Sequence, residues 1–311
     1  MCALILELEQ KNCRSMGSLN TIRVMKHFHK QFIAKARREH QHNRELARLY
    51  PDRYMSAILD GMQQSHCILS YRGNHKVYPS TTKQHITGVK QHYCWKTFYR
   101  NFQHVQGGTN LAIDILLREV YSRMEYCIAN NLPFPKTLLL QIDGGSENTS
   151  KAFMALCQLL VEQGIFDCVE VNRLPVGHTH EDIDALFGII WMNTNCKVIK
   201  TPFQWTKYAR SAFRLYDYDS TGKRRRDQNR EMPRFFDIHV VYDYKRWLDE
   251  MLDPNFGGYS KMELSALHFR FKRIGSNVEC TYKHYAIPIR NMANNQCLFW
   301  IGLKWQLRFP I

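Results

Sequence analysis

Residues 136–145 read Lys-Thr-Leu-Leu-Leu-Gln-Ile-Asp-Gly-Gly. The apolar run in this stretch is nearly continuous and is bounded by Pro135 and by Gly144-Gly145, which is typical of a central strand buried on both faces of a sheet. Asp143 follows the run directly, so its carboxylate is expected at the carboxyl end of that strand. The elements on either side of this strand then predict the fold.

Helices and strands follow one another on both sides of this stretch. Hydroxyl residues that can cap a helix precede apolar residues at helical spacing, and short apolar runs bounded by turn residues indicate strands. The predicted order is strands at Tyr54–Gly61, Lys76–Tyr78 and His85–Tyr93, a helix from Thr109 to Ile128, the strand at Lys136–Ile142, a helix from Thr149 or Ser150 to Gly164, a strand at Cys168–Asn172 and a helix from Thr179 towards Asn193.

Three strands followed by helix, strand, helix, strand, helix is the order of the ribonuclease H-like fold. We therefore predict an α/β core over residues 51–200, in which a mixed five-strand sheet is flanked by helices and carries its acids at strand ends on one edge. Residues 1–50 are predicted to form an N-terminal helical arm, because basic residues surround an apolar stripe between Asn20 and Leu49. Residues 201–311 are predicted to form an α+β extension with a basic loop.

Two carboxylates are expected side by side in this fold. Asp60 lies at the end of the first strand and Asp143 at the end of the fourth, and these strands are neighbours in such a sheet. Like charges at that distance are tolerated only when a proton or a cation lies between them. Oxygen ligands select Mg²⁺ or Mn²⁺, and two such ions about 3.5–4 Å apart can stabilise the attacking and leaving oxygens of a phosphodiester displacement.

A third acid is expected from the last helix. Its predicted sheet-facing stripe leaves Asp184 at one border, on the side of His180, and Glu181 more nearly opposite the stripe. Asp184 is therefore the first choice and Glu181 the second. The alternative for all these acids is structural, since Asp-Gly pairs form ordinary turns and acids in a first helical turn stabilise the helix dipole.

Further polar residues are candidate substrate contacts. Each also has a structural alternative, as a helix cap, a hydrogen-bonded histidine or a solvated basic run. The four basic residues of the loop at 223–226 can form either a nuclear address or a DNA contact. The candidates are His178, His180, Glu147, Asn148, Asn110, Lys223, Arg224, Arg225 and Arg226.

Composition narrows the function classes. The chain has 43 Lys+Arg against 28 Asp+Glu, a net charge of +15, which indicates a polyanionic partner. Its 44% hydrophobic content excludes wholesale disorder.

No apolar run approaches the roughly 20 residues of a membrane span, and the start lacks a basic leader, so we expect an intracellular protein without a membrane partner. The ten cysteines form no CxxC pair, which argues against a zinc ribbon.

Three segments carry a resemblance to a known family: Ile58-Leu59-Asp60-Gly61-Met62, Leu140-Gln141-Ile142-Asp143-Gly144-Gly145-Ser146-Glu147-Asn148 and Leu174-Pro175-Val176-Gly177-His178-Thr179-His180-Glu181-Asp182-Ile183-Asp184. Together they resemble an uncharacterised domain of eukaryotic transposable-element proteins, related to integrase and transposase cores with an acidic triad. The resemblance covers roughly residues 20–250. The second segment is also similar to the Asp-Asn-Gly-Ser-Glu stretch of retroviral-type integrases, with Gly144 in place of Asn.

The resemblance implies a nuclear enzyme that cleaves and joins DNA strands with Mg²⁺. Asp60 and Asp143 would be the first two triad acids, and the third stays open between Glu181 and Asp184. Two alternatives also remain open: a ribonuclease H-like nuclease that only cuts, and a non-catalytic DNA-binding or assembly module. The implied partner is DNA, with no small-molecule cofactor, and a homo-oligomer is compatible with either activity.

Overall fold

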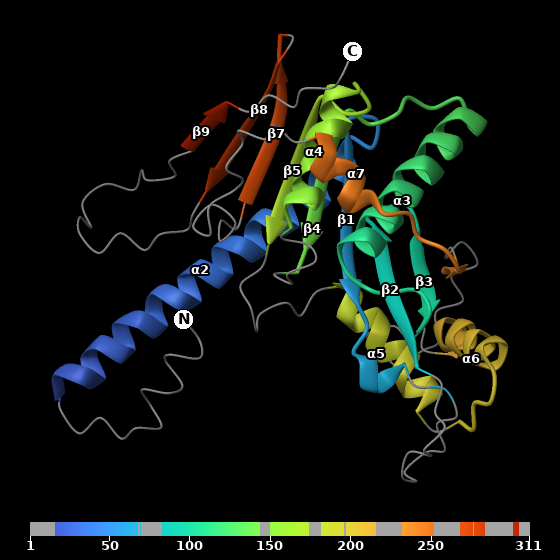
Figure 1. Cartoon of the computed structure of the whole chain (residues 1–311). Helices are drawn as coiled ribbons and strands as arrows, with labels where there is room; N and C mark the ends of the chain where they lie inside the picture. The colour runs from blue at the N-terminus through green and yellow to red at the C-terminus, as the bar shows by residue number, and fades with distance from the viewer. Residues whose placement is uncertain are drawn as a thin grey trace.

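The computed structural model describes residues 16–67, 69, 83–143, 150–173, 182–195, 197–215, 232–251, 268–275, 277–283 and 301–304. Figure 1 shows a sheet with helices on both faces, an α/β architecture as predicted. The strands are β1 (Tyr54–Gly61), β2 (Gln84–Gln91), β3 (Lys96–Phe102), β4 (Thr137–Ile142), β5 (Cys168–Arg173), β6 (Arg234–Ile238), β7 (His268–Ile274), β8 (Asn277–Lys283) and β9 (Ile301–Lys304). The helices are α2 (Met16–Leu49), α3 (Thr109–Ala129), α4 (Lys151–Glu162), α5 (Asp182–Thr194), α6 (Pro202–Leu215) and α7 (Tyr244–Met251), with a 3-10 turn η1 (Gln64–His66).

The sheet is mixed, with the strand order β6-β3-β2-β1-β4-β5-β7-β8-β9. The strand at Lys136–Ile142 is confirmed as β4, which lies near the middle of the sheet and pairs in parallel with β1 on one side and β5 on the other. Its residues Leu138–Ile142 are all buried, as the continuous apolar run predicts.

The prediction of five strands is wrong, because the sheet formed by the described residues has nine. Strands from the second half of the chain extend it at both edges: β6 pairs with β3, and β7 pairs with β5 and is followed by β8 and β9. An edge strand presents unpaired backbone N–H and C=O groups, and these added strands satisfy the groups of β3 and β5. The predicted α+β extension therefore supplies strands to the core sheet.

The meander before α3 also differs from the prediction. The strand at His85–Tyr93 is confirmed as β2, but the next strand of the meander is β3, which was not predicted. The expected strand at Lys76–Tyr78 lies outside the described residues. β3 is buried from Thr97 to Asn101 in spite of its polar side chains, so neither an alternating nor an apolar pattern marks it.

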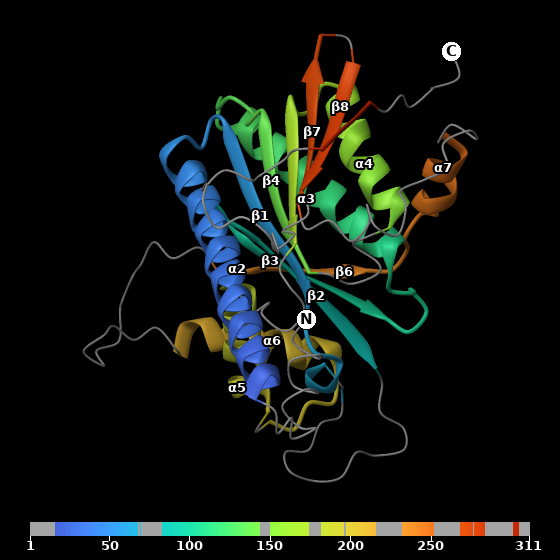
Figure 2. The same ribbon diagram turned by 90° about the vertical axis from the view of Figure 1, so that its left-hand side faces the viewer.

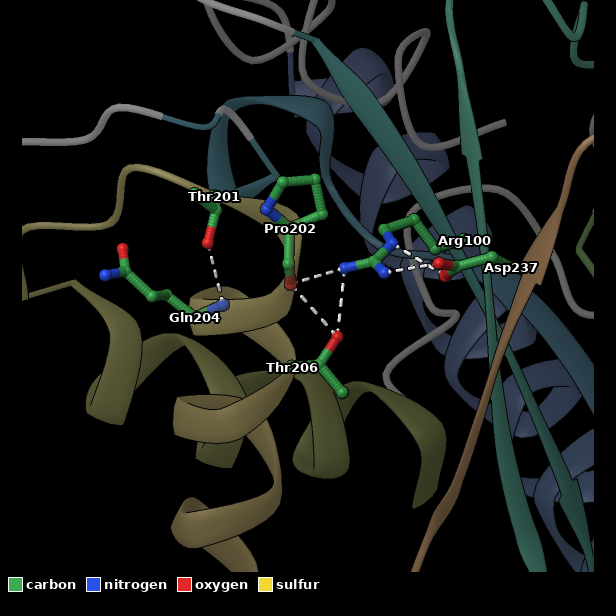
Figure 3. A network of polar contacts seen from close by, with 6 residues as sticks. All are labelled: Arg100, Thr201, Pro202, Gln204, Thr206 and Asp237. Atoms are coloured by element: carbon green, nitrogen blue, oxygen red, sulfur yellow. Dashed lines mark hydrogen bonds and ion pairs between the residues drawn. The ribbon is translucent and has the colours of Figure 1, made fainter.

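The buried Arg100 of β3 is tolerated because every side of its guanidinium has a partner. Its Nε and Nη2 donate to the carboxylate of Asp237 on β6 at 2.8 and 2.7 Å, and Nη1 donates to the Pro202 carbonyl and the Thr206 hydroxyl of α6 (Figure 3). A buried charge is strongly unfavourable unless it is paired in this way. Arg100 therefore holds β6 and α6 against the edge of the sheet.

Two apolar cores lie on the two faces of the sheet. Alternate residues of a strand face opposite sides. Ala57 and Leu59 of β1 accordingly pack into the core formed with α3, α4 and α7, whereas Ile58 packs into the core formed with α5 and α6. Figure 2 shows α3 and α4 on one side of the sheet, with α2, α5 and α6 on the other.

Helix ends follow local sequence in one case and depart from it in another. Ser150 is the N-cap of α4, as predicted, and accepts a hydrogen bond from the Phe153 N–H at 3.2 Å. Thr109 was expected to cap α3, but the cap residue is Gly108, at φ 107°, and Thr109 is the first helical residue. Glycine adopts this conformation without strain, which explains why the helix begins one residue earlier.

The basic helix predicted between Asn20 and Leu49 is confirmed as α2. Among the helices that the structure describes, none combines the length and the apolar character needed to cross a bilayer.

Candidate functional site

Asp60 and Asp143 lie at the same edge of the sheet. β1 and β4 are parallel, and the last residue pair of their register is Leu59 with Ile142. Asp60 and Asp143 are the next residues on the two strands. Since hydrogen-bonded neighbouring strands are about 4.8 Å apart, the two acids are placed next to each other, as the sequence predicted.

Both carboxylates belong to the face covered by α5. Asp60 shares its side of β1 with Ile58, which packs into the α5 core. On β4, Leu138, Leu140 and Ile142 pack into the opposite core, so Asp143 follows the strand on the α5 side.

Helix α5 lies against β2 at the point where β2 faces Asp60. Gly88 of β2 pairs with Asp60 across the β1–β2 ladder. A Cβ atom on Gly88 would lie 2.9 Å from Ile183 Cδ1 and from Phe187 Cζ. Only glycine allows α5 to lie this close. Of the five residues of the predicted sheet-facing stripe, Trp191 is half-buried, and the other four are buried: Ile183, Leu186, Phe187 and Ile190. This packing brings Asp184 towards the two strand-end acids.

The electrostatics of Asp60 reflect this arrangement. Burial, together with the charges of Asp143 and Asp184, raises its pKa to about 7 against the opposing hydrogen bond from the Gly61 N–H, which is 2.7 Å from Oδ1. The three predicted acids therefore lie in one electrostatic neighbourhood. Without a cation, the site holds a proton near neutral pH.

A pocket of about 720 Å³ opens beside these acids. Asp60 and Asp143 line it together with polar residues from η1, β2 and the start of α3. Gln63 and Gln64 are exposed and also line this pocket. Its polar lining also includes His85, Thr87, Gly107, Gly108 and Thr109. The pocket gives a polar substrate access to the carboxylates.

The other candidate residues divide into two groups. Asn110 joins α3 to α7: its Nδ2 donates to Asp243 Oδ1 at 3.0 Å, and its Oδ1 accepts from the Lys245 N–H at 2.7 Å. Its amide thus serves the structural role that we had weighed against substrate contact. The remaining candidates lie outside the described residues: Glu147, Asn148, His178, His180, Glu181, Lys223, Arg224, Arg225 and Arg226.

A second cluster of ionisable residues surrounds Asp182, at the start of α5. Its Oδ2 is 3.0 Å from Arg44 Nη1 of α2, 2.9 Å from Lys90 Nζ of β2 and 3.7 Å from His92 Nε2. The contact with His92, then those with Lys90 and Arg44, lowers the pKa of Asp182 well below its usual range. These contacts join three separate elements next to the acidic site.

Two histidines complete this second cluster. The rings of His40 and His92 are 5.3 Å apart. Burial lowers the pKa of His40 to about 4 and also lowers that of His92, so both imidazoles are neutral near pH 7. The sequence analysis missed the cluster. His40 and Arg44 are four residues apart on one helical face, but nothing local indicates that this face meets His92 and Asp182.

A family model for a domain of unknown function matches residues 76–287 of the chain. The matched segment contains Asp143 and Asp184 and begins after Asp60. A comparison with curated proteins gave no match.

The raised pKa of Asp60 predicts a pH-dependent stability. Between the ordinary value of 3.8 and about 7, the folded protein binds a proton that the unfolded chain does not, so stability falls as the pH rises through this range. In the presence of a chelator, Asp60→Asn should be more stable than the wild type by about 4 kcal/mol at pH 8 and equally stable near pH 4. Urea unfolding across this range measures the difference. The exposed Asp249→Asn serves as control, and parallel pH profiles of Asp60→Asn and wild type would contradict the prediction.

The close contact at Gly88 predicts that a larger residue there lowers both the stability of the fold and the affinity of the acidic site for a metal ion. Gly88→Ala should lower the unfolding free energy by about 1–3 kcal/mol, because the added methyl forces α5 away from β2. It should also weaken Mn²⁺ binding by moving Asp184 away from Asp60, which isothermal titration can measure. Gly61→Ala is the matched control, since a Cβ atom there meets nothing within 4 Å. Equal effects of the two substitutions would count against this packing.

Proposed function

The chain belongs to the DUF7869 family, whose function is unknown, and we propose that this member is a divalent-metal-dependent enzyme that cleaves and joins DNA phosphodiesters in the manner of transposases and integrases. The observation that carries the proposal is the meeting of Asp60, Asp143 and Asp184 beside a polar pocket. The central strand order β3-β2-β1-β4-β5 supports a ribonuclease H-like core, because two parallel strands in its middle supply the first two acids.

The donor set suits Mg²⁺ or Mn²⁺. Carboxylate oxygens are the preferred protein ligands of these ions. Burial, and then the charges of Asp143 and Asp184, raise the pKa of Asp60 to about 7, and a bound divalent cation would favour its charged form. Asp60, Asp143 and Asp184 would hold two ions, with Glu181 as the alternative third ligand. Bound there, the ions would stabilise charge on the oxygens of a phosphodiester undergoing displacement.

The protein itself would bind and orient the DNA. Asp60 and Asp143, which both line the pocket, would fix where a phosphodiester must lie to react. Gln63, just before η1, and Thr87 of β2 line the pocket and offer hydrogen bonds to a sugar-phosphate backbone. The chain needs no covalent nucleophile for this chemistry.

Helix α2 offers a surface for the DNA backbone. A tight turn joins its end at Leu49 to the start of β1, and Figure 1 shows α2 projecting away from the sheet before this turn. Arg23, Lys30 and Arg37 are exposed and seven residues apart, hence on one face of the helix. Such a row binds phosphates without reading the base sequence.

The proposal is tested by Mg²⁺-dependent nicking of DNA. Asp143→Asn and Asp184→Asn should each lower the nicking rate by about 100-fold or more, because each removes a metal ligand while preserving shape. Asp249→Asn, on the exposed surface of α7, should retain activity. Wild-type nicking without strand-transfer products on labelled DNA ends would instead indicate a nuclease that only cuts. If wild type neither cuts nor gains thermal stability with Mg²⁺, the proposal is wrong.

The role of α2 predicts a change in salt dependence. The triple variant Arg23→Gln, Lys30→Gln, Arg37→Gln should bind double-stranded DNA more weakly at every sequence, and its slope of log affinity against log salt should shrink by about 2–3. Fluorescence anisotropy from low to physiological salt measures both. Arg246→Gln, an exposed arginine of α7, is the control. If the salt dependence of the triple variant equals that of the wild type, DNA does not contact this face of α2.

A further inference from the structure

We propose that His40, His92 and Asp182 form a second metal site, chemically distinct from the acidic site and suited to Zn²⁺ or a similar transition-metal ion. The potential ligand atoms of these three residues all lie within 4.8 Å of one another. The residues come from α2, from the residue after β2 and from the start of α5. A metal here would join three elements that are far apart in the sequence. The inference does not depend on the proposed DNA chemistry.

The ligand types favour a transition metal over Mg²⁺. Imidazole nitrogen suits Zn²⁺, Co²⁺ and Ni²⁺, whereas Mg²⁺ prefers oxygen. Two histidines with one carboxylate can supply three ligands of a tetrahedral zinc site, with water in the fourth position. Zinc–nitrogen bonds of about 2.0–2.1 Å require the ligand atoms to move closer together by about 1 Å. Side-chain rotation of the half-buried His40 and Asp182 can supply this movement.

His92 is held in an orientation suited to this role. Its Nδ1 lies 2.9 Å from the Ser56 hydroxyl, which leaves Nε2 on the side of Asp182, at 3.7 Å from Oδ2. A hydrogen bond to the other ring nitrogen is what orients most metal-binding histidines in proteins. Ser56 and His92 are both buried, so this orientation is fixed by the core of the protein.

Two protein cations compete for the same carboxylate. Lys90 and Arg44 both contact Oδ2 of Asp182, and they lower its attraction for a metal. The Lys90 side chain retains 21% of its exposure and can turn towards solvent. The cluster therefore has two arrangements: an ion-paired one, which the structure shows, and a metal-bound one, in which the metal replaces the Lys90 ammonium. Removing the positive charge of Lys90 should favour the second.

The test measures metal binding to the whole chain. Zn²⁺ affinity is obtained by competition with a chromophoric chelator, and Co²⁺ binding is followed by its visible absorption. We expect a Zn²⁺ site that His92→Gln and His40→Gln each weaken by about tenfold or more, and that Lys90→Gln tightens by about tenfold. The control His104→Gln removes an exposed histidine and should leave the affinity unchanged. Asp143→Asn should also leave it unchanged, which separates this site from the acidic one.

Three results would overturn the inference. These are no saturable Zn²⁺ binding by wild type, binding that survives both histidine substitutions, or an affinity that Lys90→Gln does not increase. Circular dichroism of the metal-free variants establishes that they are folded. Lys90→Gln predicts a gain of affinity, which misfolding would not produce, so the test remains decisive if His92→Gln fails to fold.

Discussion

The parallel pairing of β1 with β4 is the constraint on which the candidate site depends. Its register ends at Leu59 and Ile142, and an acid follows on each strand, so two carboxylates are forced into a half-buried edge of the sheet. Backbone hydrogen bonds and two apolar cores fix the strands, and the acids cannot separate without breaking them. A proton or a cation stabilises such a pair, and burial followed by the charges of Asp143 and Asp184 raises the pKa of Asp60 to about 7.

The close approach of α5 adds the third acid to this edge. Gly88 has no side chain to hold the helix away, and Ile183 and Phe187 occupy the space that a Cβ atom would need. The apolar stripe of α5 thus determines where Asp184 lies. Two residues earlier, Asp182 is tied to α2 and β2 by Arg44 and Lys90. The two acids of the same helix therefore have different environments, one with other carboxylates and one with cations.

Sequence predicted those parts of the structure whose signal is local. The apolar run of β4, the Ser150 cap of α4 and the stripe of α5 each lie within a dozen or so residues, and all three are confirmed. The order of the elements then predicted that the strands ending at Asp60 and Asp143 are neighbours in the sheet, as they are. The place of the added strands in the sheet was not foreseen, because it depends on pairing over long distances. β3 is the clearest case: its buried Arg100 is acceptable only because Asp237 lies beside it, 137 residues further along the chain. The Asp182 cluster was missed for the same reason.

The strands after residue 200 flank the sheet on opposite sides, with β6 against β3 and β7 against β5. A fragment that stopped at the expected boundary of the core would lose both neighbours at once. β3 and β5 would then be edge strands with unpaired N–H and C=O groups. Such strands pair with strands of other copies, and this pairing leads to aggregation. Main-chain hydrogen bonding thus joins the two halves of the chain, and a fragment that ends near residue 200 would be more prone to aggregation than the whole chain.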